Sequence, residues 1–232
     1  ADAGISGVNF AVAETGTLCL VENEGNGRLS TTAPRLHIAI TGIEKVVEKL
    51  SDVPPMLEIL TKSATGQPIT TYFNMISRPR QPDELDGPQA VHLVLLDNGR
   101  SRIRVDDELL DTLRCIRCGT CMNYCPVYVQ TGGHAYGTVY PGPIGIALEP
   151  QRLGLQQVGT LTSACTMCGA CGEVCPVKIP LPKLINRLRA EAVNEHRTTT
   201  PLHGRGSLRK PGEATVWKLW QQLNSRPRLY RW

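Results

Sequence analysis

The sequence predicts an α/β unit followed by a helical unit. In the first hundred residues, short apolar segments alternate with turn residues, a pattern typical of strands. Beyond residue 105, apolar side chains recur at the spacing of helix faces. This second part also carries eight of the nine cysteines. A chain of 232 residues has room for one domain of ordinary size and a smaller one, so two modules are expected.

Four apolar segments of the first part are predicted to be strands. They are bounded by Gly, Thr, Asn and Asp, and they span residues 8–12, 18–22, 36–40 and 90–96. Residues 42–50 place four apolar side chains on one side of an expected helix. The prolines of residues 53–55 are expected to end that helix, and residues 56–62 to form another. The polar, proline-rich residues 78–88 are predicted to form a surface loop.

The second part is predicted to be helical. Asp106 and Asp107 can cap a helix that leads toward the first cysteine. A glycine- and tyrosine-rich loop, residues 131–142, is expected to precede a helix that begins near Ile144. Leucines and isoleucines between residues 184 and 192 lie on one helical face. A helical domain is therefore favoured over a compact domain built on hairpins.

Eight cysteines form two identical runs. Every member of the second run lies 50 residues after its counterpart in the first, and Gly119 and Gly169 match at the same offset. This regularity indicates an internal duplication, so two equivalent units are expected to bind two equivalent groups. The runs are Cys115, Cys118, Cys121 and Cys125, followed by Pro126, and Cys165, Cys168, Cys171 and Cys175, followed by Pro176.

The spacing of each run is that of an iron–sulfur motif. In C-x2-C-x2-C-x3-C-P, three thiolates converge on a cluster from one tight loop, while the fourth serves the other cluster of a two-cluster protein. The sequence therefore predicts two [4Fe–4S] clusters with exchanged fourth ligands. One set would be Cys115, Cys118, Cys121 and Cys175, and the other Cys165, Cys168, Cys171 and Cys125.

Two other uses of cysteine fit the sequence less well. Structural zinc usually takes two pairs separated by a longer loop, which fits these runs poorly. A disulfide framework suits a small secreted domain, whereas this chain is large and has an odd number of cysteines. Cys19 lies apart in an apolar segment and is expected to be a buried hydrophobic residue. Reduced cysteines predict a reducing compartment, in agreement with a cytoplasmic protein.

Several segments together resemble one known family. GVNFAVAETGTLCLVENEGN, HIAITGIEKVV, the doubled cysteine motif and GGHAYGTVYPGPIGIALEP resemble the lactate-utilisation iron–sulfur protein family across nearly the whole chain. The resemblance implies the C-terminal half of an α/β domain similar to ribose-phosphate isomerase and CoA transferases, followed by a helical dicluster ferredoxin domain. The implied boundaries are 1–104, 105–197 and, for a basic C-terminal extension, 198–232. Family members have a long stretch ahead of Ala1, so the chain is expected to be a fragment.

The resemblance further implies two partner proteins and the oxidation of L-lactate to pyruvate. This reaction removes two electrons and two protons, whereas a [4Fe–4S] cluster accepts one electron, so the reactive centre must lie elsewhere. The glycine pairs at residues 25–27 and 204–206 lack the third glycine of a dinucleotide-binding fingerprint. We therefore expect an electron relay within a multi-protein oxidoreductase, with redox donor and acceptor proteins as partners.

Two alternatives belong to other functional classes. Glu14 and Glu24 lie in turns at strand ends, where the α/β domain could bind or transform a small carboxylic acid or acyl substrate itself. Alternatively, the clusters could serve only as structural supports. No catalytic residue follows from the sequence.

The charge pattern adds little about partners. Residues 1–110 are acidic and residues 199–232 are basic, within a net charge of +4. The tail lacks the dense basic run of a nucleic-acid binder. No apolar stretch is long enough to cross a bilayer. Trp217 and Trp220 form an amphipathic stripe that is expected to pack on the body or on a partner, and that allows a peripheral membrane contact.

Overall fold

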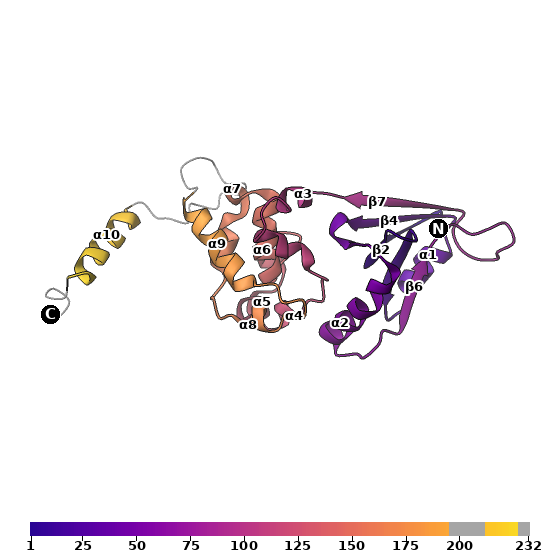
Figure 1. Cartoon of the computed structure of the whole chain (residues 1–232), viewed down its shortest axis with the longest axis horizontal. Helices are drawn as coiled ribbons and strands as arrows, with labels where there is room; N and C mark the ends of the chain where they lie inside the picture. The colour runs from indigo at the N-terminus through magenta and orange to yellow at the C-terminus, as the bar shows by residue number, and fades with distance from the viewer. Residues whose placement is uncertain (195–211, 227–232) are drawn as a thin grey trace.

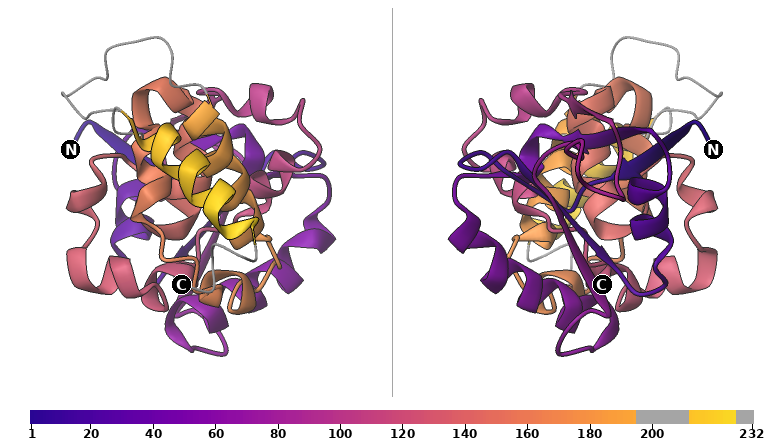
Figure 2. Two further views of the ribbon diagram at one scale, coloured as in Figure 1. Left: turned by 90° about the vertical axis from the view of Figure 1, so that its left-hand side faces the viewer. Right: turned by 90° about the vertical axis from the view of Figure 1, so that its right-hand side faces the viewer.

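The computed structural model describes residues 1–194 and 212–226. It contains an α/β unit, a helical unit and a C-terminal helix, α10 (Glu213–Asn224), in that order along the long axis (Figure 1). Figure 2 (right) looks onto the α/β unit, with the helical unit behind it. The glycine pair at 204–206 and two parts of the predicted extension 198–232, residues 198–211 and 227–232, lie outside the described residues.

Two sheets build the α/β unit. One is a parallel three-stranded sheet with the order β1-β4-β7, and the other is a four-stranded mixed sheet with the order β5-β2-β3-β6. The strands are β1 (Ala3–Gly7), β2 (Phe10–Val12), β3 (Thr17–Glu22), β4 (Leu36–Gly42), β5 (Val46–Val47), β6 (Tyr72–Ile76) and β7 (Ala90–Leu96). The helices are α1 (Asn26–Thr32), α2 (Val53–Thr65) and two single turns of 3₁₀ helix, η1 (Ile43–Lys45) and η2 (Leu50–Asp52).

The mixed sheet packs against α2. Phe10 and Val12 of β2 and Cys19 of β3 meet Val53 and Leu60 of α2 in one buried cluster. Cys19 has no exposed surface, so the prediction of a buried apolar role is confirmed. Strand alternation produces this face, because successive side chains of a strand point to opposite sides of the sheet.

The parallel sheet keeps an apolar surface uncovered. Its edge strand β7 pairs only with β4 in the described part of the chain, and the four apolar residues 93–96 are exposed. Ile5 of the opposite edge strand is exposed as well. Successive residues of a strand point to opposite sides of the sheet, so β7 has exposed apolar side chains on both of its faces.

The predicted helix over residues 42–50 is wrong. This segment forms η1, the short strand β5 and the start of η2. Val46 and Val47 pair in parallel with Ala11 and Val12 of β2, because β-branched side chains fit a sheet surface better than a helix. The prolines also act differently than expected. Pro54 and Pro55 occupy the first turn of α2, where their missing N–H groups cost no hydrogen bond.

The helical unit contains no strand within residues 105–194, all of which the structure describes. The preference for a helical domain over hairpins is thus confirmed. Its elements are α3 (Arg100–Ile103), η3 (Leu109–Arg114), α4 (Thr120–Asn123), α5 (Pro126–Thr131), η4 (His134–Tyr136), α6 (Gly142–Leu153), α7 (Leu155–Val158), η5 (Gly159–Ala164), α8 (Ala170–Glu173) and α9 (Leu181–Asn194). The helices α6 and α9 carry its core, with Ile146, Leu184, Ile185 and Leu188 almost fully buried.

Asp106 lies just before the helix η3 and holds the start of that helix through its carboxylate. Its carboxylate accepts hydrogen bonds from the backbone N–H groups of Glu108 and Leu109, at 3.1 and 3.0 Å, although the N-cap residue of the helix that follows is Glu108 and not one of the two predicted aspartates. The helix that it begins is η3, a 3₁₀ helix. Arg187 of α9 donates to the same carboxylate at 2.9 Å. This guanidinium is the largest cause that lowers the pKa of Asp106 to about 2.

Replacement of Asp106 is expected to destabilise the helical unit. Asp106→Ala removes the backbone hydrogen bonds and one of the three carboxylate partners of Arg187, so the free energy of unfolding should fall by about 1 to 2 kcal/mol. Asp106→Asn keeps an oxygen that can accept the backbone hydrogen bonds and should cost less. Denaturant unfolding followed by circular dichroism compares the two variants. Equal losses of unfolding free energy in the two variants would show that the backbone hydrogen bonds to Asp106 add nothing to the effect of its charge.

No helix in the described ranges is long and apolar enough to cross a membrane. The amphipathic stripe of α10 is exposed, and Trp217 and Trp220 contact each other edge-on at 5.7 Å between ring centroids. The stripe thus does not pack on the body in this structure.

Candidate metal centre

The cysteine repeat is also a repeat of backbone structure. A 3₁₀ helix precedes each run, and a four-residue helix holds the third cysteine of each; both pairs of elements are offset by 50 residues. Arg117 and Met167 occupy equivalent left-handed positions, with φ of 64° and 58°. Gly119 and Gly169 do so as well, with φ of 80° and 85°. Two left-handed residues in each loop turn the chain sharply, so that neighbouring thiols face one side.

The first group of thiols surrounds one cavity. Cys115, Cys118 and Cys121 of the first run line it together with Cys175 of the second. Its volume is about 250 Å³, and the rest of its wall is largely apolar. Burial is the largest cause that raises the pKa of Cys121, to about 12.

The second group also combines cysteines of both runs. The charges of Cys165, Cys168 and Cys125 act on the Cys171 thiol and, after burial, help to raise its pKa to about 11. Three members come from the second run and the fourth from the first. The charge of Cys171 also contributes to the raised pKa of Cys121, so the two groups adjoin.

The donor set fits iron–sulfur clusters. Four soft sulfur donors around a cavity of about 250 Å³ leave room for more than one metal atom. Within residues 1–194 and 212–226, no three His, Cys, Asp or Glu side chains converge as they would around a single metal ion. None of the nine cysteines, all within the described ranges, forms a disulfide. Because burial disfavours a free thiolate, a positively charged metal centre would provide the compensating interaction.

Backbone N–H groups point at three of the sulfurs. Tyr128 and Ile179 donate to Cys125 and Cys175 at 3.5 and 3.4 Å, and Met167 donates to Cys165 at 3.3 Å. These weak hydrogen bonds favour the thiolate form and would tune a bound iron–sulfur centre.

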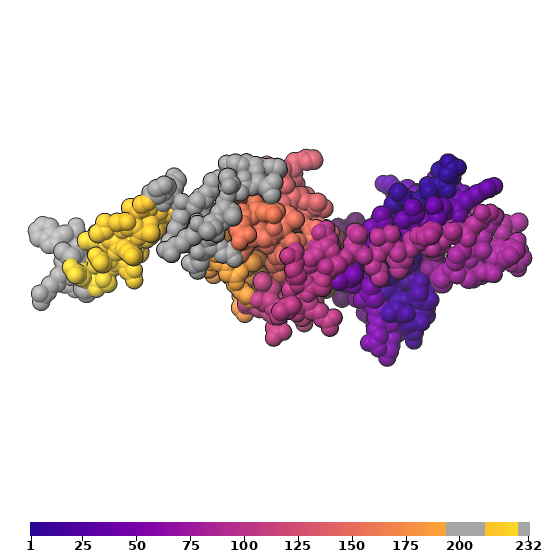
Figure 3. Space-filling view, turned by 90° about the horizontal axis from the view of Figure 1, so that it is seen from above, coloured from indigo at the N-terminus to yellow at the C-terminus, as the bar shows by residue number. Residues whose placement is uncertain are grey.

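A buried charge network lies beside the first group. Arg117, between two of its cysteines, forms an ion pair with Glu44 of η1 at 3.2 Å. Arg100 of α3 forms an ion pair with the same carboxylate, and Arg117 stacks over the Tyr140 ring at 4.2 Å. Thr120 donates from its hydroxyl to the backbone oxygen of Ser63 at 2.6 Å. The first ligand loop therefore joins the α/β unit to the helical unit, which adjoin end to end in Figure 3.

The surroundings of the second group differ. Met167 takes the place of Arg117, so the equivalent position carries no charge. Cys168 is exposed, whereas its counterpart Cys118 is partly buried. Arg189 of α9 supports this loop by donating to the backbone oxygens of Thr162 and Cys165, at 2.6 and 2.7 Å.

The two glutamates of the alternative hypothesis have local structural partners. Glu14 accepts a hydrogen bond from the backbone of Leu50 at 3.1 Å. Glu24 is exposed and accepts from the side chain of Asn26 at 3.2 Å. Neither arrangement indicates a catalytic group.

Sequence reasoning missed the charge network of Glu44, Arg100 and Arg117. One signal was available, since Arg117 and Met167 are the same position of the duplication and differ in charge. The partners of Arg117 lie in other elements, and their approach depends on the tertiary fold.

Family models cover three successive parts of the chain. Residues 1–96 match the LUD domain, residues 111–179 match the 4Fe-4S dicluster domain, and residues 187–232 match the C-terminal model of lactate utilisation protein B. Lactate utilization protein B of Macrococcus caseolyticus is 48% identical over 195 residues, which are 84% of this chain and 41% of that protein. The chain is thus similar to lactate utilisation protein B over most of its own length.

Other relatives extend this comparison. The uncharacterized electron transport protein YkgF of Escherichia coli K12 is 44% identical over 231 residues, which are 100% of this chain and 46% of that protein. The chain thus spans less than half the length of these relatives. A crystal structure of a DUF162 family protein from Deinococcus radiodurans is 21% identical and covers 41% of this chain and 53% of that chain, with a TM-score of 0.31.

Proposed function

We propose that this chain carries two [4Fe–4S] clusters and passes single electrons within a multi-protein oxidoreductase that oxidises L-lactate to pyruvate. The observation that carries the proposal is the pair of four-thiol groups, each built from three cysteines of one run and one of the other. Cys115, Cys118, Cys121 and Cys175 would hold one cluster, and Cys165, Cys168, Cys171 and Cys125 the other.

The names of the relatives support both halves of the proposal. One is called an electron transport protein and others are called lactate utilization protein B. Oxidation of lactate releases two electrons together, and a [4Fe–4S] cluster supplies one-electron chemistry when bound. The hydride or electron pair must therefore be taken up by a partner that holds another redox centre.

The residues of this chain would position and tune the two centres. The apolar wall of the first cavity would exclude water, and the N–H groups of Tyr128, Met167 and Ile179 donate toward the sulfurs. Adjacent thiol groups would hold the centres close together, which suits electron transfer from one to the other.

We further propose the boundaries 1–104, 105–197 and 198–232 for an α/β domain, a dicluster domain and a basic extension. The parallel β1-β4-β7 sheet supports a fold of the CoA-transferase and ribose-phosphate isomerase type for the first. Nine unpaired cysteines support a reducing, cytoplasmic location.

Anaerobic purification tests this function. Iron and sulfide analysis should give two four-iron clusters per chain, and reduction should produce the electron paramagnetic resonance signals of interacting [4Fe–4S]⁺ centres. A potentiometric titration should find at least one centre reducible within reach of the lactate couple. Colourless, metal-poor protein would contradict cluster binding, and redox-inert clusters would leave them only a structural role.

A further inference from the structure

Tyr136 of η4 is a buried side chain with an unsatisfied hydroxyl group. It is 3% exposed and packs in the buried cluster of the helical unit that also contains Cys171. Its Oη makes no well-aligned hydrogen bond. Buried polar atoms in folded proteins almost always have a partner, because an unpaired one costs free energy. The Tyr136 hydroxyl is therefore a donor with unused capacity inside the core.

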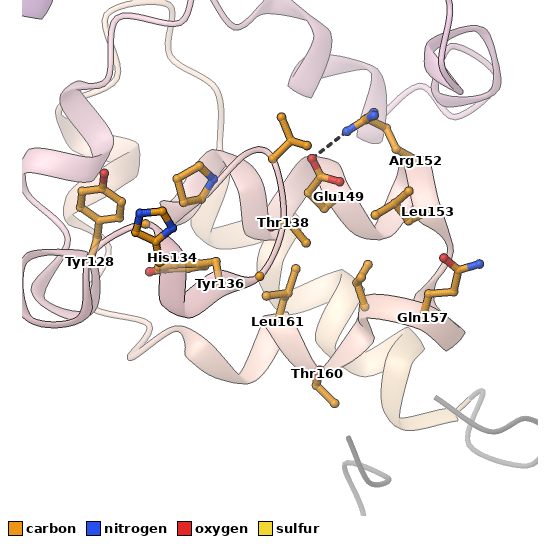
Figure 4. A pocket seen from close by; sticks show the side chains of 15 residues that line it. Tyr128, His134, Tyr136, Thr138, Glu149, Arg152, Leu153, Gln157, Thr160 and Leu161 are labelled. Atoms are coloured by element: carbon orange, nitrogen blue, oxygen red, sulfur yellow. Dashed lines mark hydrogen bonds and ion pairs between the residues drawn. The ribbon is translucent and has the colours of Figure 1, made fainter. Parts of the chain in front are cut away.

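This hydroxyl faces the interior of the helical unit. The ring of Tyr136 forms part of the wall of a cavity of about 840 Å³ beside η4 and α6. Figure 4 shows the hydroxyl on the side of Tyr128, away from Glu149 and Arg152. The ring centroids of Tyr128 and Tyr136 lie 6.1 Å apart. Because the oxygen itself is buried, its partner must lie on the inner side of the ring and not in the cavity.

The inner side of the ring faces the second thiol group. Tyr128, the ring neighbour of Tyr136, donates from its backbone N–H to the Cys125 sulfur at 3.5 Å. Burial is the largest cause that raises the pKa of Tyr136 to about 12, and the charge of Cys125, a contact with its side chain and the charge of Cys165 add to it. The phenol thus keeps its proton at neutral pH. A hydrogen-bond donor lies beside two ligands of the proposed second cluster.

Cluster binding would change the acceptor that this donor meets. A thiol sulfur is a weak hydrogen-bond acceptor, whereas a metal-bound cysteine is a thiolate. A hydrogen bond to an ionised acceptor is roughly twice as strong as one between neutral groups. Reduction adds one negative charge to a cluster, so a donor at a ligand sulfur stabilises the reduced form more than the oxidised form. The Tyr136 hydroxyl would therefore favour reduction of the second cluster.

We propose that Tyr136 is a positioning residue of the second cluster, whose hydroxyl donates a hydrogen bond to the Cys125 sulfur and raises the reduction potential of that cluster. This inference rests on the proposed cluster binding. The effect is specific to the second cluster. Tyr136 lies eleven residues after Cys125, and the residue eleven positions after Cys175 is Asn186, which is exposed and offers the first group no buried hydroxyl.

A potentiometric titration of the anaerobic holoprotein tests the role of this hydroxyl. Tyr136→Phe keeps the ring and removes only the donor. At the midpoint potential of the native second cluster, its ratio of reduced to oxidised form should fall roughly two- to tenfold, while the first cluster keeps its potential. Tyr124→Phe is the matched control, because it removes the same atom from an exposed tyrosine next to Cys125 in the sequence. It should shift neither potential.

A spectroscopic measurement adds a readout that a merely structural role would not move. Electron–nuclear double resonance of the reduced protein in light and heavy water detects exchangeable protons that are coupled to a cluster. Tyr136→Phe should lack one such coupling of the second cluster, and Tyr124→Phe should keep all of them.

Iron and sulfide analysis of the same samples separates the possible failures. Native protein without clusters would overturn the proposed function and this role together. An unchanged second potential in a Tyr136→Phe protein that holds both clusters, or loss of the second cluster from this variant, would overturn the role of Tyr136 alone.

Discussion

Cys175→Ala is expected to remove the cluster of the first cysteine run, although Cys175 belongs to the second. The side chain lines the same cavity as Cys115, Cys118 and Cys121. Without its fourth thiolate, that cluster should be lost or reduced to a smaller form, and the iron content should fall by up to about half. The remaining spectrum should match that of Cys118→Ala.

The reciprocal variants complete this test. The iron content and spectrum of Cys125→Ala should match those of Cys168→Ala, because the charge of Cys125 acts on Cys171 of the second group. Cys19→Ala is the control, since that thiol is buried in the α/β unit and should leave the iron content unchanged. Iron analysis and electron paramagnetic resonance distinguish these outcomes. A Cys175→Ala spectrum like that of Cys168→Ala would contradict the exchange of fourth ligands.

Arg117→Met is expected to lower the reduction potential of the first cluster by tens of millivolts. The substitution gives the first loop the residue that the second loop has at Met167. A partly buried cation favours the reduced, more negative form of a nearby cluster, and its removal takes this stabilisation away. Potentiometric titration with spectroscopic detection measures both potentials.

The neighbouring network supplies controls for this second test. Arg117→Lys keeps the charge and should retain much of the potential, although it loses the stacking on Tyr140. The second cluster should shift little in either variant. An unchanged first potential in Arg117→Met would show that Glu44, which pairs with Arg117, already cancels its charge at the cluster.

The parts of the fold with strong local signals could be predicted from the sequence. Cysteine spacing alone predicts that Cys175 serves the first run, because the motif dictates which thiol leaves its loop, and in the structure Cys175 lines the same cavity as that run. The strand at residues 90–96 matches β7 in both bounds. The α6 helix was expected near Ile144 and begins two residues earlier, at Gly142.

Other parts depend on tertiary contacts that no local pattern contains. Apolar spacing over residues 42–50 fits a helix, yet pairing of β5 with β2 decided the outcome. Strand β6 was missed, and it is held by pairing with β3. The charge network joins Glu44 to two arginines that lie more than 50 positions away in the sequence, so no local pattern identifies its members.

The loop that carries three ligands of the first group also fastens the two units together. Arg117 and Thr120 reach across to Glu44 and Ser63, whereas the second loop is supported by Arg189 within its own unit. Loss of the two centres by oxidation would thus affect the structure unequally. Loss of the second would alter only the loop that holds it. Loss of the first would loosen the contact between the α/β unit and the helical unit, and would expose the chain that connects them to proteases.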